Sequence, residues 1–158
     1  MNRKKRNNKF NPCNLNLVIF IAALLIIILF SINYLKSNKN QVCIKDNCFL
    51  VSLASTQEER QQGLMNVNKL DENKGMLFIF QEEDINPFWM KNTLIPLDII
   101  WINSSLDVVY IKENAQPCNE TCEIIIPTTK SLYTLEINAN LTEKYPLKLG
   151  DKVLLNFP

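Results

Sequence analysis

A continuous apolar stretch near the N-terminus, residues 15–35, constrains this chain most: LNLVIFIAALLIIILFSINYL. At a rise of about 1.5 Å per residue, a helix of that length crosses a hydrocarbon core of about 30 Å. A cleaved signal peptide also has a basic head and an apolar run, but its apolar core is usually about 7–15 residues long and precedes a small-x-small cleavage site. Here the stretch is longer and SINYLKSNKN ends it. The sequence therefore predicts a retained single transmembrane helix, with a cleaved signal peptide as the alternative.

The distribution of charge predicts the orientation of this helix. Residues 1–40 hold seven of the 17 basic residues and no acid, whereas residues 41–158 hold ten basic and all 16 acidic residues. Cytoplasmic flanks of membrane helices carry an excess of Lys and Arg, so the basic cluster from Arg3 to Lys9 indicates a cytoplasmic N-terminus. We therefore expect a cytoplasmic tail (1–14), a membrane helix (15–35), a tether (36–41) and an extracytoplasmic domain (42–157) in the cell membrane. The acidic body argues against nucleic-acid binding.

The cysteines agree with this orientation. Cys13 precedes the apolar stretch, whereas Cys43, Cys48, Cys118 and Cys122 follow it as an even set. An even set beyond the membrane predicts two disulfides in an oxidising compartment, and the short spacings CIKDNC and CNETC favour two local loops over buried free thiols. Neither spacing has the two-residue gap of a zinc knuckle, and the chain has no histidine, so we expect no metal site.

The body is large enough for one domain with its own core. Many short β-type segments separated by turn-rich pieces predict an all-β (mainly β) sandwich or barrel with one or two short helices. A hairpin with its turn at Asp46-Asn47 begins the domain, and TQEERQQG predicts a helix in which Thr56 and Glu59 form a capping box and Gly63 ends it in the left-handed conformation. The further strands we expect are GMLFIF, LDIIWI, DVVYIKE, EIII, SLYTLEINA and KVLLNF.

Asp98 interrupts LDIIWI, a segment that is otherwise apolar on both faces. Such a strand is expected to be central, and a carboxylate inside it must be hydrogen-bonded, paired with a cation or neutral. Arg60, the single arginine after the apolar stretch, and Lys91 are the candidate cations. Lys91, Asn92 and Thr93 are candidate hydrogen-bond donors.

Five segments, in this order and spacing, carry a family resemblance: VSLASTQEERQQGLM, GMLFIF, FWMKNTLIPLDIIWI, VVYI and YTLEINA. Together they resemble the domain of unknown function family 192 over roughly residues 42–157. The resemblance implies a compact β-rich sandwich or barrel domain, often found behind a signal peptide or a membrane anchor. It implies no established activity.

Within the last four of these segments, Asp98 and Glu136 are the carboxylates, and such a pair could perform acid–base chemistry, including glycoside cleavage. We favour the other interpretation, in which Asp98 stabilises the fold and Glu136 simply lies on a wet strand face. With no histidine and with its cysteines in disulfides, the domain lacks the usual general base and the thiol nucleophile. Trp89, next to Phe88, could stack on a sugar or a partner.

We therefore expect a membrane-anchored extracytoplasmic domain that binds a small ligand or a cell-envelope partner, without a cofactor. The alternative is a carboxylate-dependent enzyme acting on envelope glycans or related small substrates. The candidate ligand-binding residues are Arg60, Trp89, Lys91, Asn92, Asp98 and Glu136.

Overall fold

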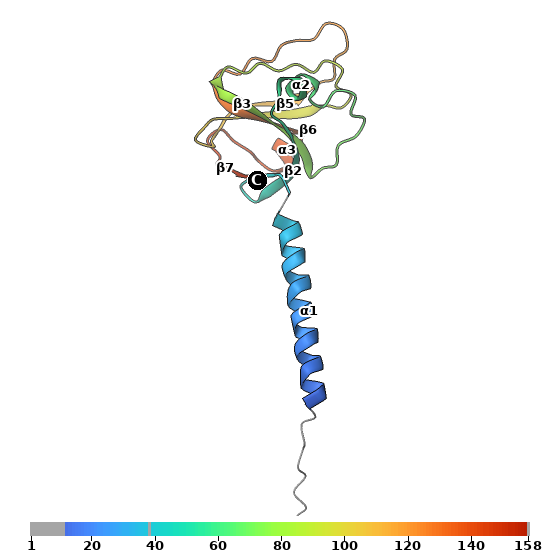
Figure 1. Cartoon of the computed structure of the whole chain (residues 1–158). Helices are drawn as coiled ribbons and strands as arrows, with labels where there is room; N and C mark the ends of the chain where they lie inside the picture. Colours follow the sequence, from blue (N-terminus) through green and yellow to red (C-terminus); the bar gives the residue numbers. More distant parts are fainter. Residues whose placement is uncertain (1–11, 38, 158) are drawn as a thin grey trace, which may run out of the picture. The chain divides into compact units, whose positions relative to one another are not determined.

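The computed structural model describes residues 12–37 and 39–157, and the chain divides between Lys39 and Asn40 into two compact units. The first unit contains helix α1, Pro12–Ser37 (Figure 1). The side chains described in it, from Leu17 to Ser31, are mostly apolar and exposed. Among the described residues, no helix combines the length and apolar character that crossing a membrane requires. The anchor at residues 15–35 therefore stays a prediction, and residues 1–11 of the predicted tail lie outside the described residues.

The described part of the second unit contains one sheet of seven strands, in the order β5-β4-β6-β3-β2-β1-β7. The strands are β1 Gln41–Ile44, β2 Asn47–Ala54, β3 Lys74–Asp84, β4 Leu97–Ile102, β5 Val108–Ala115, β6 Ser131–Asn138 and β7 Val153–Asn156. Neighbouring strands are antiparallel except β2 and β3, which are parallel. A parallel pair needs a crossover connection, which residues 55–73 supply. This connection includes the short helix α2, Gln57–Gln62.

The two edge strands of the sheet approach each other at one end. Asp107 and Lys152, just before β5 and β7, form an antiparallel bridge. Val108 N donates to Asp151 O at 3.0 Å, and Val153 N donates to Leu106 O at 2.9 Å. The sheet is thus a curled half-barrel, so the mainly-β class is confirmed, with a single curled sheet in place of a two-sheet sandwich.

Strand β4 is central, as its sequence predicts, and all six of its residues are buried. Ile100 and Ile102 belong to one apolar cluster of the core, while Leu97, Ile99 and Trp101 belong to another. The first cluster lies among the strands and the short helix α3, Leu141–Lys144. The second is covered by irregular segments that contribute Leu64, Val67, Phe88, Met90, Ile95, Cys118 and Ile125. The irregular segments also carry three of the six candidate ligand-binding residues, Trp89, Lys91 and Asn92.

Local sequence signals place α2 correctly. Thr56 and Glu59 form the predicted capping box, and Gly63 follows the helix. Gly63 has φ 46° and ψ −136°, so its φ is positive as predicted but its conformation is not left-handed helical. The first hairpin turns at residues 45–46, one residue earlier than predicted. EIII forms no strand; within it, Ile125 forms an isolated bridge with Phe88.

Candidate functional site

The candidate site is built on residues 87–93, PFWMKNT, which we call the site segment. It lies outside the named strands, yet backbone hydrogen bonds hold it on both sides. Phe88 and Ile125 exchange two of them, at 2.9 and 2.8 Å. Asn92 N donates to Cys118 O at 2.8 Å, and Asn92 O accepts from Asn66 N at 2.9 Å. The segment is therefore fixed between the loop after α2 and the loop that carries the second disulfide.

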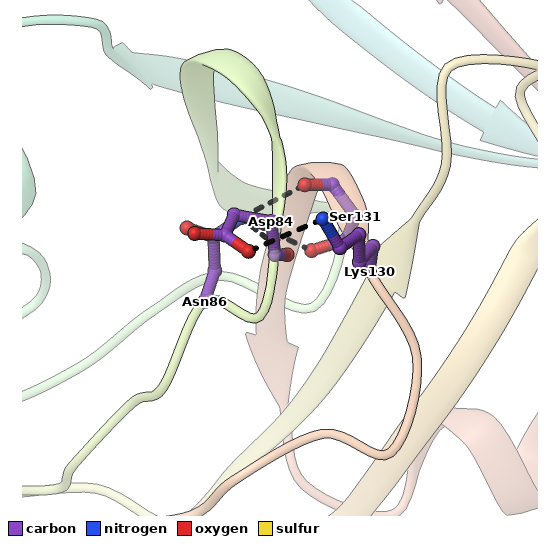
Figure 2. Close-up of polar contacts among 4 residues, drawn as sticks. All are labelled: Asp84, Asn86, Lys130 and Ser131. Carbon is purple, nitrogen blue, oxygen red and sulfur yellow. Dashed lines mark hydrogen bonds and ion pairs between the residues drawn. The ribbon is translucent and has the colours of Figure 1, made fainter.

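Asn86 fixes the point where the chain leaves β3 for the site segment, as Figure 2 shows. Its Nδ2 donates to Ser131 O at 2.8 Å and to Asp84 O at 3.2 Å, which joins the end of β3 to the start of β6. Lys130 Nζ lies 3.7 Å from Asp84 Oδ1, an exposed ion pair at the same junction. Asn86 O also accepts a hydrogen bond of 2.8 Å from Trp101 Nε1 of β4. One asparagine thus links three strands at the base of the site segment.

Two adjoining hollows lie between the site segment and the end of α2, and we call them together the cleft. The smaller, the Glu136 cavity, has a volume of about 30 Å³, and its charged lining residues are Arg60, Lys91 and Glu136. The larger, the aromatic hollow, has a volume of about 240 Å³ and includes Phe80 in its walls. Both hollows are lined by Arg60, Gln61, Phe78, Phe88 and Trp89. The two volumes are therefore neighbouring parts of one site.

Glu136 is buried at 5% exposure, which makes the expectation of a wet strand face wrong. Its Cα partners are Met76 and Ile99, so it lies on the sheet face that the irregular segments cover. Oε2 has no hydrogen-bond partner among the described residues, and neither has the buried Oγ1 of Thr134 on the same face. Loss of solvation raises the pKa of Glu136 to about 8, so the carboxyl is mostly protonated at neutral pH.

Arg60 is an oriented cation at the junction of the two hollows. Its Nη1 donates to Ser55 O at 2.5 Å and to Ile79 O at 3.0 Å. The guanidinium carbon lies 5.4 Å from the centroid of the Phe80 ring. None of the ion pairs between described residues involves Arg60. Because two carbonyls and one ring hold the guanidinium, a ligand would meet it in a preset orientation.

Lys91 and Trp89 form the outer wall of the cleft. Lys91 Nζ lies 5.2 Å from the centroid of the Trp89 ring, and Trp89 is 47% exposed. Its neighbour Phe88 points the other way and packs edge-on against Phe78 and Trp101, with centroids 4.8 and 5.5 Å away. Adjacent residues of an extended segment point to opposite sides, so Phe88 packs inside and Trp89 stays accessible.

Asp98 lies outside the cleft, and the prediction that Arg60 or Lys91 is its partner is wrong. The carboxylate is fully buried and accepts three hydrogen bonds. Asn114 N donates to Oδ1 at 2.8 Å, while Thr142 N and Oγ1 donate to Oδ2 at 2.8 and 2.7 Å. Asp98 therefore holds β5 and the first turn of α3 against β4, and these donors replace a cation.

The structure thus brings together four of the candidate residues and separates two. Arg60, Trp89, Lys91 and Glu136 line the cleft. Asn92 is exposed and has a positive φ of 55°, and its backbone secures the site segment. Asp98 lies on the opposite face of the sheet from Glu136, so the proposed carboxylate pair does not share one site.

Both predicted disulfides are present. Cys43–Cys48 joins directly opposite residues of β1 and β2, and Cys118–Cys122 closes the loop beside the site segment. The Cys13 side chain lies outside those described. Among the described residues, no group of three His, Cys, Asp or Glu side chains is placed to hold a metal ion.

Sequence reasoning missed the aromatic walls of the cleft and its small residues. Phe78 and Phe80 were expected only as part of a strand, yet Phe78 lines both hollows. Gly63 was expected only as a helix end, but a Cβ built there would lie 3.2 Å from Phe78 Cζ. The positive φ of Gly63 and this close approach occur at the rim of the Glu136 cavity. The sequence indicates the turn at Gly63, but it does not indicate which side chains pack against this residue.

Comparison with known proteins gives a family match and several similar solved structures, two of which follow. The family model DUF192, described as an uncharacterized ACR, matches residues 40–155. A crystal structure of a protein of unknown function from Novosphingobium aromaticivorans DSM 12444 is 36% identical with a TM-score of 0.66, over 73% of this chain and 83% of that chain. A candidate transcription regulator from Sinorhizobium meliloti 1021 is 34% identical with a TM-score of 0.69, over 75% of this chain and 95% of that chain. No curated protein matches.

Proposed function

The chain belongs to the DUF192 family, whose role is uncharacterised, and from this premise we propose that its second unit is a binding module that takes a small ligand in the cleft. The observation that carries the proposal is the buried Glu136 carboxyl, whose Oε2 has no partner among the described residues. A buried polar atom without a hydrogen bond costs roughly 1–3 kcal/mol. A ligand atom that bonds to Glu136 would remove this cost.

The surroundings of Glu136 support binding more than catalysis by paired carboxylates. Ligand sites are typically concave and apolar, with a few polar groups that converge. The cleft has this composition, since aromatic walls surround Arg60, Lys91 and Glu136. Asp98 is on the other face of the sheet, and its carboxylate is occupied by three hydrogen bonds. An acid–base pair made of Asp98 and Glu136 would need both carboxyls at one substrate.

A protein-observed NMR screen of the full, isotope-labelled chain in detergent micelles tests the proposal. The set should contain small acids, bases and neutral compounds, and the indole N–H of Trp89 should report binding in the cleft. Trp101 serves as the internal control, because its indole is buried and donates to Asn86 O. We expect saturable binding that shifts the Trp89 signal and leaves the Trp101 signal in place. A screen without saturable binding at Trp89 would contradict the proposal.

We further propose that residues 15–35 anchor the module in the cell membrane and that the module is extracytoplasmic. Helix α1 has exposed apolar side chains from Leu17 to Phe30, and a helix that is apolar all round is suited to a membrane or a protein core. The two disulfides support an oxidising compartment.

Protease added outside intact cells tests the anchor. We expect it to remove the second unit and to leave a short N-terminal fragment that stays in the membrane after alkaline washing. Protection of the second unit in intact cells would contradict the orientation. Release of the whole unit into the medium without protease would favour the signal-peptide alternative.

A further inference from the structure

We propose that the cleft selects a small organic carboxylate with a flat apolar body, bound with the carboxylate in the Glu136 cavity and the body in the aromatic hollow. The inference rests on the proposed function, because it names the ligand class of the same site. The size difference agrees with this arrangement, since the cavity is about 30 Å³ and the hollow about 240 Å³.

The charges that line the cleft favour an anion. Arg60 and Lys91 are its two cations, and Glu136 is the single acidic residue that lines either hollow. Neither cation takes part in an ion pair between described residues. Because burial keeps the carboxyl of Glu136 mostly protonated at neutral pH, it does not neutralise them. Two unpaired cations at a half-enclosed site attract an anionic group.

The orientation of Arg60 favours a planar anionic group over other anions. Nη1 donates both of its hydrogens to backbone carbonyls, those of Ser55 and Ile79. The remaining N–H groups, on Nε and Nη2, include two parallel donors along one edge of the guanidinium. That edge matches the two oxygens of a carboxylate, which it binds through two parallel hydrogen bonds.

The protonated Glu136 contributes a donor where an ionised carboxylate would repel the ligand. Its hydroxyl can donate to a ligand oxygen, as neutral acids do in sites that hold anions. The charged groups that line the cavity with Glu136 are Arg60, in α2, and Lys91, in the site segment. On β3 and β4 its neighbours Met76 and Ile99 are uncharged. Binding of a carboxylate should therefore weaken as Glu136 ionises.

An amine fits the same cleft poorly. Aromatic rings beside a carboxyl can hold an ammonium group, but here the protein's own cations already lie over the rings. Arg60 lies over Phe80 at 5.4 Å, and Lys91 lies over Trp89 at 5.2 Å. A ligand ammonium group would meet two positive charges at close range. A flat apolar body, by contrast, can contact the exposed Trp89 and the edges of Phe78 and Phe88.

Three probes of the same shape and different charge test the inference: para-fluorobenzoate, para-fluorobenzamide and para-fluorobenzylamine. Fluorine NMR with the full chain in detergent micelles measures their affinities. We expect the benzoate to bind at least about tenfold more tightly than the amide, because only the benzoate forms a pair of charge-assisted hydrogen bonds. We expect the amine to bind least. Stronger binding of the amide or the amine would overturn the ligand class and leave the binding module intact.

Matched variants locate the anion. Lys91→Gln and Arg60→Gln should each weaken benzoate binding roughly tenfold, whereas Lys74→Gln, which removes an exposed cation paired with Asp71 outside the cleft, should not. Lys91→Gln is the safer variant, because no described hydrogen bond of the fold uses its side chain. Unchanged benzoate affinity in both cleft variants would overturn the placement.

A pH series adds a readout that a loss of folding would not imitate. In the parent, benzoate affinity should fall as pH rises past about 8, by up to roughly tenfold per unit, while the affinity for the amide stays level. Glu136→Gln should remove this dependence. Failure of all three probes to bind would overturn the ligand class, and the broader screen of acids, bases and neutral compounds separately decides whether the cleft binds anything.

Discussion

Asp98 and Glu136 lie on opposite faces of one sheet, although neighbouring strands carry them. Asp98 is the Cα partner of Ile137, and Glu136 is the partner of Ile99, so the two carboxyls are one register position apart and point in opposite directions. Both are buried in apolar surroundings, but only Asp98 has donors aimed at it. The first carboxyl therefore stabilises the fold, and the second remains available to a ligand.

Asp98→Ala is expected to lower the free energy of unfolding by roughly 3–5 kcal/mol, because it leaves the two buried donors of Thr142 and the part-buried N–H of Asn114 without an acceptor. Asp98→Asn should cost less, since one amide oxygen still accepts. Urea unfolding measures both. A double-mutant cycle that combines Asp98→Ala with Thr142→Val should show a coupling energy of about 0.5–3 kcal/mol. The destabilisation caused by Arg60→Met or Lys91→Met should instead add to that of Asp98→Ala. Strong coupling to either cation would restore the ion-pair interpretation.

Glu136 should make the stability of the domain depend on pH. Its pKa rises from 4.5 to about 8 on folding. Below about pH 4.5 both states are protonated; between about 4.5 and 8 only the folded state keeps the proton, so stability falls as pH rises, by at most about 1.4 kcal/mol per unit. Above about 8 both states are ionised and the dependence ends. The loss between pH 4.5 and pH 7 is therefore roughly 3 kcal/mol.

Glu136→Gln should abolish this pH dependence, as measured by urea unfolding across the pH series. Glu82→Gln, at an exposed position on β3, is the matched control and should keep the slope of the parent. The same flat profile in parent and Glu136→Gln would show that Glu136 is ionised in the folded protein, or solvated.

Local chemistry explains what was predictable. The Thr56–Glu59 capping box and the pairing of Cys43 with Cys48 depend on residues three and five positions apart, and the buried β4 follows from apolar residues on both faces. The partners of Asp98 depend on topology instead. Its donors are 16 and 44 residues away, and two of the three are backbone N–H groups, which every non-proline residue carries.

The sequence does not predict the cleft, for a related reason. Its walls come from α2, β3, the site segment and β6, and their meeting depends on the strand order β6-β3-β2. The burial of Glu136 depends on irregular segments that cover its face, whereas the alternation of LYTLEINA alone resembles a half-solvated strand. Periodicity reports the regular elements and carries no signal for loops that cover a sheet.

Gly75→Ala is expected to destabilise the domain by about 1–3 kcal/mol through overpacking. A Cβ at Gly75 would lie 2.5 Å from Glu136 O and 3.0 Å from Ile137 Cγ2, so β3 and β6 would have to move apart. Gly150→Ala is the comparison, since a Cβ there meets no atom within 4 Å and the strain comes from its φ of 85°. Thermal unfolding measures both. We expect loss of benzoate binding in Gly75→Ala alone, and equal binding in both would contradict the tight β3–β6 contact beneath the cleft.

The two disulfides allow a matched test of how the site segment is held. Each closes a short loop, with sequence separations of 5 and 4, and each should stabilise by about 2 kcal/mol in the chain-entropy picture. Only Cys118–Cys122 adjoins the site segment, because Cys118 O accepts from Asn92 N and Cys118 N donates to Met90 O.

Replacing Cys118 and Cys122 by serine should therefore loosen the site segment, while replacing Cys43 and Cys48 should not. Hydrogen exchange measures the difference: the amides of Phe88 and Asn92, both hydrogen-bonded to the 118–125 loop, should exchange faster only in the first variant. Ligand affinity at the cleft should fall with them, because a mobile segment must be ordered on binding. If both variants lose the same stability and the Phe88 and Asn92 amides stay equally protected, the loop does not hold the site segment, and the contacts of Asn66 and Asn86 are sufficient to do so.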